Sequence, residues 1–264
     1  MGHLVDYTTE RGVALLTIND PPVNSYTHEL LTDLDACITD ARFDTDVSVV
    51  IITGHGENYF SAGANITMLR EVDPGFRYNF FLCASETMTR IEHTPKLVIA
   101  ALNGHAVGGG MEIALACDLR IARAHSGTIG LPELNLGLLP GGGGTQRLAR
   151  FVSKGQAMQM ILEGTKLDFE EARRIGLVNE VWETPTHTDF IERVVEYAHR
   201  FTAPGKSPLA VGRVKRAVQA AYELPIEQGQ ALERELHAQL LGSADADEGL
   251  AAWIAKRTAS FQGR

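Results

Sequence analysis

The chain has 264 residues, of which 44% are hydrophobic and 22% are charged. This balance is typical of a folded globular protein, and the length allows one large domain or a domain with an appendage. The net charge of −9 disfavours nonspecific binding to nucleic acid, which needs a basic surface. No run approaches the ~20 consecutive apolar residues of a membrane-spanning helix.

The three cysteines, Cys37, Cys83 and Cys117, are far apart and form no CxxC pair. This spacing argues against a disulfide framework and against a cysteine-based zinc site. Residues 1–12 have neither the apolar core of a signal peptide nor the Arg- and Ser-rich composition of a transit peptide. The final "FQGR" carries no peroxisomal address. We therefore expect a cytoplasmic protein without a bound metal.

Four short apolar runs predict strands in the first half of the chain, at 13–18, 47–53, 97–102 and 119–124. The second and third runs are continuously apolar, as in strands that are covered on both faces. Between the runs, apolar residues recur at helical spacing over 28–42 and 75–93. Strands that alternate with helices predict an α/β fold.

Beyond about residue 150 the pattern becomes helical. Ser153 and Gln156 fit a capping box, in which a side-chain oxygen and a Gln or Glu three residues later satisfy the first N–H groups of a helix. From residue 206 onward we expect three helices, interrupted at Pro225 and at "GSADAD" (242–247).

Most catalytic motifs are absent from the sequence. It contains no GxxxxGK[ST], GxGxxG or GxSxG, and "HELLT" is not the zinc-binding HExxH. Phosphate-loop, dinucleotide-binding, serine-hydrolase and zincin functions are therefore unsupported. Two glycine-rich segments remain, 108–110 and "LPGGGG" at 139–144.

The glycines at 108–110 directly precede a predicted helix, whose first N–H groups have no partner inside the helix and attract negative charge. A second turn, "YFSAGANI" (59–66), follows the predicted strand 47–53. If the two turns converge, their N–H groups form an oxyanion hole. The alternative is that both are simply tight turns, for which glycine is the usual residue.

Two carboxylates lie in apolar surroundings near these segments. Glu112, within "GHAVGGGMEIALACD" (104–118), occupies a helix that is apolar on every side, although a glutamate at this position can also cap its own helix. Glu133 lies between a proline and apolar residues, and its alternative is a loop carboxylate in water. Two such acids beside anion-binding backbone indicate paired acid and base chemistry on a polarised carbonyl.

Four blocks of the sequence resemble the signature blocks of the crotonase superfamily, which includes the enoyl-CoA hydratases and isomerases. They occur in the family's order over nearly the whole chain, and the ending "WIAKRTASFQGR" is also similar. The blocks are "PPVNS" (21–25), "FSAGANI" (60–66), "ALNGHAVGGGMEIALACDLRIA" (101–122) and "GLPELNLGLLPGGGGTQRL" (130–148).

The resemblance implies a fold and a set of roles. The fold would be a spiral of ββα units over 1–200, carrying the active site, followed by helices over 201–264 that form trimers and cover the acyl-CoA. Ala64 and Gly109 would supply the N–H groups of the oxyanion hole. Glu112 would activate a water that adds to Cβ of the substrate, and Glu133 would protonate Cα.

Further residues would contact the substrate by the same resemblance. In the last helix, Trp253 and Lys256 match an aromatic residue and a lysine that reach the CoA of a neighbouring subunit. Asn65 stands where the family usually has aspartate. The remaining predicted substrate contacts are near the acyl chain: Ala62, Ile66, Met68, Leu136 and Leu138.

The family resemblance implies a hydratase that adds water to a 2-enoyl-CoA. No metal or redox cofactor would be needed, because coenzyme A is part of the substrate, and the protein would be a homotrimer or a dimer of trimers. The alternatives within the family are an enoyl-CoA isomerase or a hydratase specialised for branched, aromatic or polyketide-linked acyl groups. An RNA-binding member would need a basic stripe, which the net charge disfavours. A glycoside hydrolase also uses two carboxylates but usually offers several stacking aromatics, and this chain has only two tryptophans.

Overall fold

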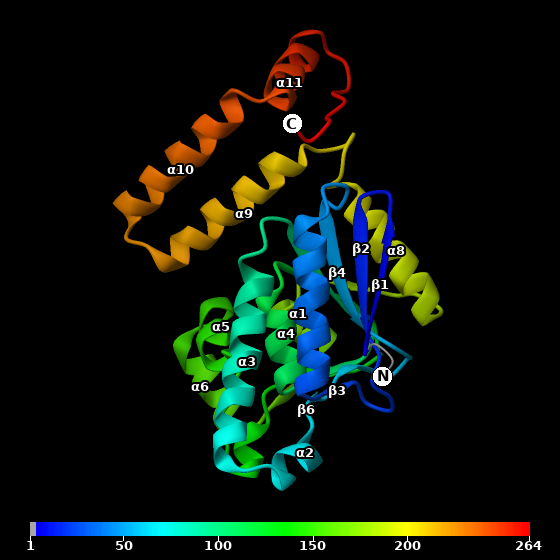
Figure 1. Cartoon of the computed structure of the whole chain (residues 1–264), viewed down its shortest axis with the longest axis vertical. Coiled ribbons are helices and arrows are strands. Elements are labelled where there is room, and N and C mark those ends of the chain that lie inside the picture. The colour runs from blue at the N-terminus through cyan, green and yellow to red at the C-terminus, as the bar shows by residue number, and fades with distance from the viewer. Residues whose placement is uncertain (1–3) are drawn as a thin grey trace.

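A six-stranded sheet forms the centre of the computed structural model, which describes residues 4–264 (Figure 1). Strand β1 pairs antiparallel with β2, and all other neighbours in this sheet are parallel. The strands, in their order across the sheet, are β1 (Val5–Glu10), β2 (Val13–Ile18), β4 (Val49–Gly54), β7 (Leu97–Leu102), β9 (Leu119–Arg123) and β12 (Glu180–Trp182).

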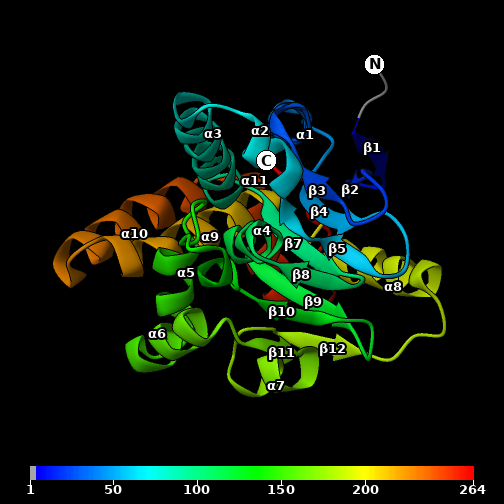
Figure 2. The ribbon, with the colours of Figure 1, turned by 90° about the horizontal axis from the view of Figure 1, so that it is seen from below.

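A second, four-stranded sheet contains shorter strands, and Figure 2 shows them side by side. Its parallel part is formed by β5, β8 and β10, and β11 pairs antiparallel with β10. These strands are β5 (Tyr59–Ser61), β8 (His105–Val107), β10 (Thr128–Gly130) and β11 (Lys166–Asp168). A third sheet consists of β3 (Ser25–Tyr26) and β6 (Gly63–Ala64).

The chain repeats one structural unit three times. Each unit has a strand in the six-stranded sheet, then a strand in the four-stranded sheet, and then one or more helices. The strand pairs are β4 with β5, β7 with β8, and β9 with β10. The helices that complete the units are α2 (Ile66–Glu71) with α3 (Pro74–Glu92), then α4 (Gly109–Ala116), and finally the 3-10 helix η1 (Glu133–Leu136) with α5 (Gly144–Phe151). This repetition is the predicted spiral of ββα units, so the predicted α/β fold class is confirmed, while the trimer-forming role of the C-terminal helices stays a prediction.

Helices cover both faces of the six-stranded sheet. On one face, α1 (His28–Phe43), α3 and α4 contribute to the main hydrophobic core. On the other face, α8 (His187–His199) packs Phe190, Val194 and Ala198 against buried residues of the strands. The apolar runs predicted as doubly covered strands are β4 and β7, and both are almost fully buried. Two short helices, α6 (Lys154–Glu163) and α7 (Phe169–Arg174), complete this part of the chain.

The last three helices extend away from the sheets (Figure 1). They are α9 (Pro208–Glu223), α10 (Ile226–Leu241) and α11 (Ala244–Ile254), so the three predicted C-terminal helices and both interruptions are present. Lys215 of α9 forms a buried ion pair with Asp118 at 2.7 Å, which ties α9 to the start of β9. The division into a core at 1–200 and a C-terminal region at 201–264 stays a prediction, and residues 1–3 of that core lie outside the described residues.

The predicted elements agree closely with the structure. The runs 13–18 and 97–102 coincide with β2 and β7, and the run 47–53 corresponds to β4, which begins two residues later. The predicted helices at 28–42 and 75–93 correspond to α1 and α3. Across residues 4–264, none of the helices combines the length and the apolar character that crossing a membrane requires.

Candidate active site

The carboxyl ends of β5, β8 and β10 meet at one edge of the four-stranded sheet. Ala106 of β8 pairs with Ser61 on one side and Ile129 on the other, so the three strands are aligned and parallel. Each of the three predicted functional stretches begins just beyond one of these strands. The edge at the carboxyl ends of parallel strands is the usual place for a ligand site in α/β proteins.

The two glycine-bearing turns converge at this edge. Gly63 has φ of +86°, and a Cβ at this position would lie 2.6 Å from the backbone nitrogen of Gly109. Only glycine allows both this conformation and this close approach. The turn after β5 therefore packs directly against the first residue of α4.

Ala64 and Gly109 both belong to the wall of one cavity of about 300 Å³. The N–H of Asn65 donates to the carbonyl of Tyr26 at 3.0 Å. Because successive residues of a strand point their N–H groups in opposite directions, the N–H of Ala64 points away from β3. Gly109 is the first residue of α4, and its N–H therefore has no acceptor within the helix. The role of both N–H groups as an oxyanion hole stays a prediction.

Glu112 is 1% exposed and caps the start of another helix rather than its own. Its Oε1 accepts hydrogen bonds from the N–H groups of Gly142 and Gly144, each at 2.8 Å, and Gly144 is the first residue of α5. Burial raises the pKa of Glu112, while these two N–H groups and the positive charge of Arg147 act against that rise. The structure thus holds the carboxylate in a dry site but supplies partners for its charged form.

Glu133 has a different environment, although it lines the same cavity. It begins η1, and among the described residues its Oε2 is buried without a hydrogen-bond partner. Burial raises the pKa of Glu133 to about 7, and the nearby charge of Glu112 adds to the rise. The neutral form of Glu133 is therefore well populated near neutral pH, in contrast to a loop carboxylate in water.

Four of the residues predicted near the acyl chain line the cavity: Ala62, Ile66, Leu136 and Leu138. Asn65 and Met68 lie outside the cavity wall. Asn65 is the N-cap of α2, and its Oδ1 accepts a hydrogen bond from the Met68 N–H at 3.0 Å. Met68 packs against the hydrophobic core, whereas Leu69, the next residue of α2, belongs to the cavity wall.

Trp253 and Lys256 are far from this cavity within the chain. Trp253 is 85% exposed near the end of α11, and Lys256 follows two residues after that helix ends. Neither residue contributes to the cavity wall formed by the residues of this chain. Their predicted contact with the CoA of a neighbouring subunit stays a prediction.

Several cavity residues were not predicted from the sequence: Tyr26, Phe81, Asn135, Leu139 and Lys166. Tyr26 directly follows the block at 21–25, but its place against Gly109 results from the pairing of β3 with β6. The apolar pattern of α3 shows that this region is buried, but it does not show that Phe80 faces the core while Phe81 faces the cavity. Among the described residues, the buried hydroxyl of Tyr26 has no hydrogen-bond partner.

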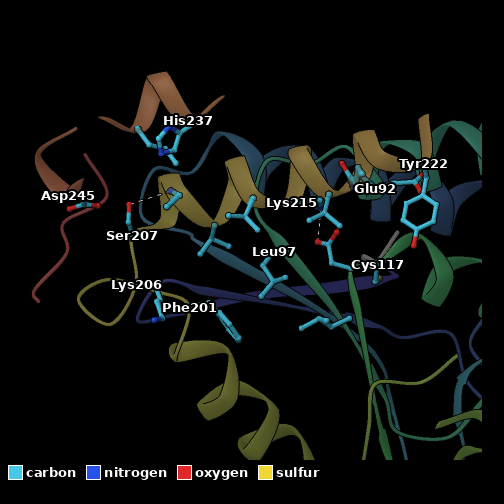
Figure 3. Close-up of a pocket in the computed structure, with 18 of the residues that line it drawn as sticks. Glu92, Leu97, Cys117, Phe201, Lys206, Ser207, Lys215, Tyr222, His237 and Asp245 are labelled. Atoms are coloured by element: carbon cyan, nitrogen blue, oxygen red, sulfur yellow. Dashed lines mark hydrogen bonds and ion pairs between the residues drawn. The ribbon is translucent and has the colours of Figure 1, made fainter. Parts of the chain in front are cut away.

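A larger cavity of about 940 Å³ lies between the C-terminal helices and the core (Figure 3). Figure 3 shows Lys215 on its wall together with Leu97 and Cys117 of the core. None of the predicted site residues lines this cavity. It is nevertheless close to the candidate active site, because Arg147 belongs to its wall and also influences Glu112.

The contact between Gly109 and Tyr26 predicts the effect of a single added methyl group. A Cβ on Gly109 would overlap the hydroxyl of Tyr26. We expect Gly109→Ala to lower the free energy of unfolding by about 1–3 kcal/mol, the usual cost of overpacking. Denaturant unfolding monitored by circular dichroism measures this change.

The matched control is Gly155→Ala in α6, because nothing lies within 4 Å of a Cβ at that position. This control should be neutral or slightly stabilising. In a Tyr26→Ala background, most of the cost of Gly109→Ala should disappear. An equal cost in both backgrounds would show that Tyr26 is not what requires glycine at position 109.

Comparisons with known proteins agree with this geometry. A family model described as enoyl-CoA hydratase/isomerase matches residues 8–264. The short-chain-enoyl-CoA hydratase of Clostridium acetobutylicum is 37% identical over 94% of this chain and 93% of its own length. The 2,3-dehydroadipyl-CoA hydratase of Escherichia coli is 36% identical, with 97% of each chain covered. A crystal structure of an enoyl-CoA hydratase from Geobacillus kaustophilus superposes with a TM-score of 0.95 at 40% identity, covering 100% of this chain and 98% of that one. The chain therefore belongs to the enoyl-CoA hydratase/isomerase family.

Proposed function

We propose that this protein is an enoyl-CoA hydratase, which adds water to the same face of both carbons of a 2-enoyl-CoA double bond and forms a 3-hydroxyacyl-CoA. The observation that carries the proposal is the pairing of two glutamates at one cavity, where two backbone N–H groups bind the carboxylate of Glu112 and burial raises the pKa of Glu133 to about 7. The hydratase names of the relatives support the same reaction.

The backbone would polarise the thioester. In the proposed complex, the thioester oxygen accepts hydrogen bonds from the N–H groups of Ala64 and Gly109. Negative charge grows on this oxygen as the enolate forms, so the two donors stabilise the transition state more than the substrate. Each donor in such a site contributes about 3–4 kcal/mol.

The two carboxyl groups would then move the protons. Ionised Glu112 accepts a proton from a water whose oxygen bonds to Cβ, and neutral Glu133 donates its proton to Cα. The partners of Glu112 favour its charged form, whereas Glu133 has a pKa of about 7 and can donate. After this step Glu112 holds one extra proton and Glu133 lacks one. Transfer of one proton from Glu112 to Glu133 restores both groups, so the net reaction adds one water to the double bond.

The reaction transfers no electrons between substrate and enzyme, and we propose that it needs neither a metal nor a cofactor besides the CoA of its substrate. The apolar side chains of Ile66, Leu136 and Leu138 would contact the acyl group.

A cytoplasmic location is part of the proposal. The free cysteines Cys37 and Cys83, both partly exposed, are consistent with a reducing compartment.

We also propose that the C-terminal helices assemble the protein as a trimer or a dimer of trimers. Large apolar side chains on these helices are exposed in the single chain, and contiguous exposed patches of this kind usually mark protein interfaces. They include Val214, Val218, Tyr222, Leu250, Trp253 and Ile254. A second copy of the chain is the occupant we propose for this surface, and Lys256 would then lie near the CoA of the neighbouring subunit.

The acids provide the direct test of the reaction. We expect Glu112→Gln and Glu133→Gln each to lower kcat for hydration of crotonyl-CoA at least ~100-fold, because each removes one proton-transfer group. The loss of absorbance of the conjugated thioester measures the rate. The exposed Glu180→Gln is the control and should leave kcat unchanged. Full activity in a folded Glu112→Gln variant would exclude the proposed hydratase, and loss only with Glu133→Gln would indicate an isomerase.

The pH dependence tests the assignment of the two roles. Because the proton donor must be neutral, kcat/KM of the parent enzyme should fall as the pH rises through about 7, where Glu133 becomes ionised. The residual activity of Glu133→Gln should lack this alkaline decline. An unchanged decline in that variant would show that another group is the donor.

Ala64→Pro tests the oxyanion hole at the other proposed donor. Proline removes the N–H. We expect a fall in kcat of about 10²–10³-fold and a smaller red shift in the absorbance of a bound cinnamoyl-type CoA. Ala64→Ser, which keeps the N–H, should retain the shift. If the folded proline variant retains the full shift, Ala64 is not a donor.

Light scattering tests the assembly, and we expect the mass of three or six chains in solution. Within that assembly, Lys256→Ala should raise KM for the CoA substrate with little change in kcat, because the lysine would bind CoA rather than the reacting atoms. Lys154→Ala, which changes an exposed lysine of α6, is the control. A stable, fully active monomer would contradict both the assembly and the role of Lys256.

A further inference from the structure

Arg147 links the candidate active site to the larger cavity. Its side chain is 8% exposed and extends from α5 along the wall of that cavity. The Nη1 of Arg147 donates a hydrogen bond to the carbonyl of Gly142 at 2.8 Å. This carbonyl belongs to the short loop that precedes α5.

The same loop holds the carboxylate of Glu112. The N–H groups of Gly142 and Gly144 both donate to Oε1 of Glu112, and Gly143 between them has φ of +101°. Gly142 therefore has its N–H on Glu112 and its carbonyl on Arg147. A movement of Arg147 would therefore rotate the backbone of Gly142 and change the hydrogen bonds that Glu112 accepts.

Glu92, the last residue of α3, fixes the guanidinium from the other side. Its Oε2 accepts from Nη2 of Arg147 at 2.8 Å and from Nε at 3.2 Å. The backbone carbonyl of Glu92 in turn accepts from the side-chain amide of Gln219 in α9 at 2.6 Å. The planar guanidinium can serve the Glu92 carboxylate and the Gly142 carbonyl together, which a lysine ammonium does less well.

We propose that Arg147 is a positioning residue for Glu112, which holds the loop at 142–144 in the geometry that binds the carboxylate and keeps a positive charge beside it. This inference rests on the proposed function only where it predicts a change in the rate of hydration. The structural part, the control of Glu112 by Arg147, stands on the contacts of α3, α4 and α5.

The charges around Glu112 determine the direction of the expected effect. Arg147 is the positive charge that favours ionised Glu112, and Glu92 partly balances it. Glu133 faces Glu112 from η1 and opposes its ionisation when charged, and Tyr26 adds a hydroxyl from β3. Removing the positive charge should therefore raise the pKa of Glu112, so that the base is protonated over a wider range of pH.

The kinetic experiment compares pH profiles of kcat/KM for crotonyl-CoA. In Arg147→Met, the acid limb should move upward by about one pH unit, which lowers kcat/KM about tenfold on that limb. The effect should appear in kcat more than in KM, because Arg147 is not in the wall of the substrate cavity. Arg150→Met removes an exposed arginine from the same helix and should leave the profile unchanged.

Arg147→Lys keeps the charge but not the planar fork, so its acid limb should lie between those of the parent and Arg147→Met. This variant also tests the proposal if the methionine variant fails to fold. A uniform loss of kcat/KM at every pH in Arg147→Lys or Arg147→Met, with the acid limb in place, would show a merely structural role and overturn the proposal.

A titration without substrate separates this inference from the proposed function. Carbon-13 NMR of labelled glutamate carboxyl groups, with Glu112 assigned by its loss in Glu112→Gln, follows the ionisation of Glu112 directly. We expect its midpoint to rise in Arg147→Met and to stay in place in Arg150→Met. An unchanged midpoint in Arg147→Met overturns the inference. If the parent enzyme shows no hydration activity, the proposed function fails while this titration still decides the role of Arg147.

Discussion

The parallel alignment of β5, β8 and β10 is the constraint on which the candidate site depends. These strands are short, but each is followed by a stretch that contributes to the cavity: Ala62 and Ala64 after β5, Gly109 after β8, and Glu133 after β10. Residues about 70 positions apart in the chain are brought together because parallel strands end at the same edge. The ββα unit occurs three times along the spiral. The site lies where the second strands of the three units end side by side.

Burial raises the pKa of both carboxyl groups of this site, but the groups that surround each carboxyl differ. Moving a carboxylate out of water is costly unless hydrogen bonds or charges replace the lost solvation. Glu112 receives such partners from the loop before α5, whereas within residues 4–264 the buried Oε2 of Glu133 has none. Two acids of the same side-chain type thereby have different surroundings, and differences of this kind let a pair of acids take separate roles in acid–base catalysis.

The C-terminal helices are connected to the candidate active site through a few polar contacts. Lys215 of α9 pairs with Asp118, and Gln219 of the same helix binds the carbonyl of Glu92. Glu92 in turn orients Arg147, so docking of α9 and the geometry around Glu112 share one network. The exposed apolar side chains on α9 and α11 would complete this arrangement in the proposed assembly.

The sequence by itself determined the α/β class, the order of the main elements and the two candidate acids. These predictions depend on local patterns: apolar runs identify β4 and β7, and an acid inside an apolar helix marks Glu112. The family was recognisable because four motifs occur in order along the chain.

Only the tertiary structure decided which residues complete the site. The sequence pattern could not distinguish Phe81 from Phe80 or Leu69 from Met68, since a difference of one position on a helix changes which face a side chain occupies. Tyr26 reaches the cavity through strand pairing, and Arg147 reaches Glu112 through the backbone of Gly142. Long-range contacts of this kind leave no periodic signal in the sequence, because they depend on how separate elements pack in space.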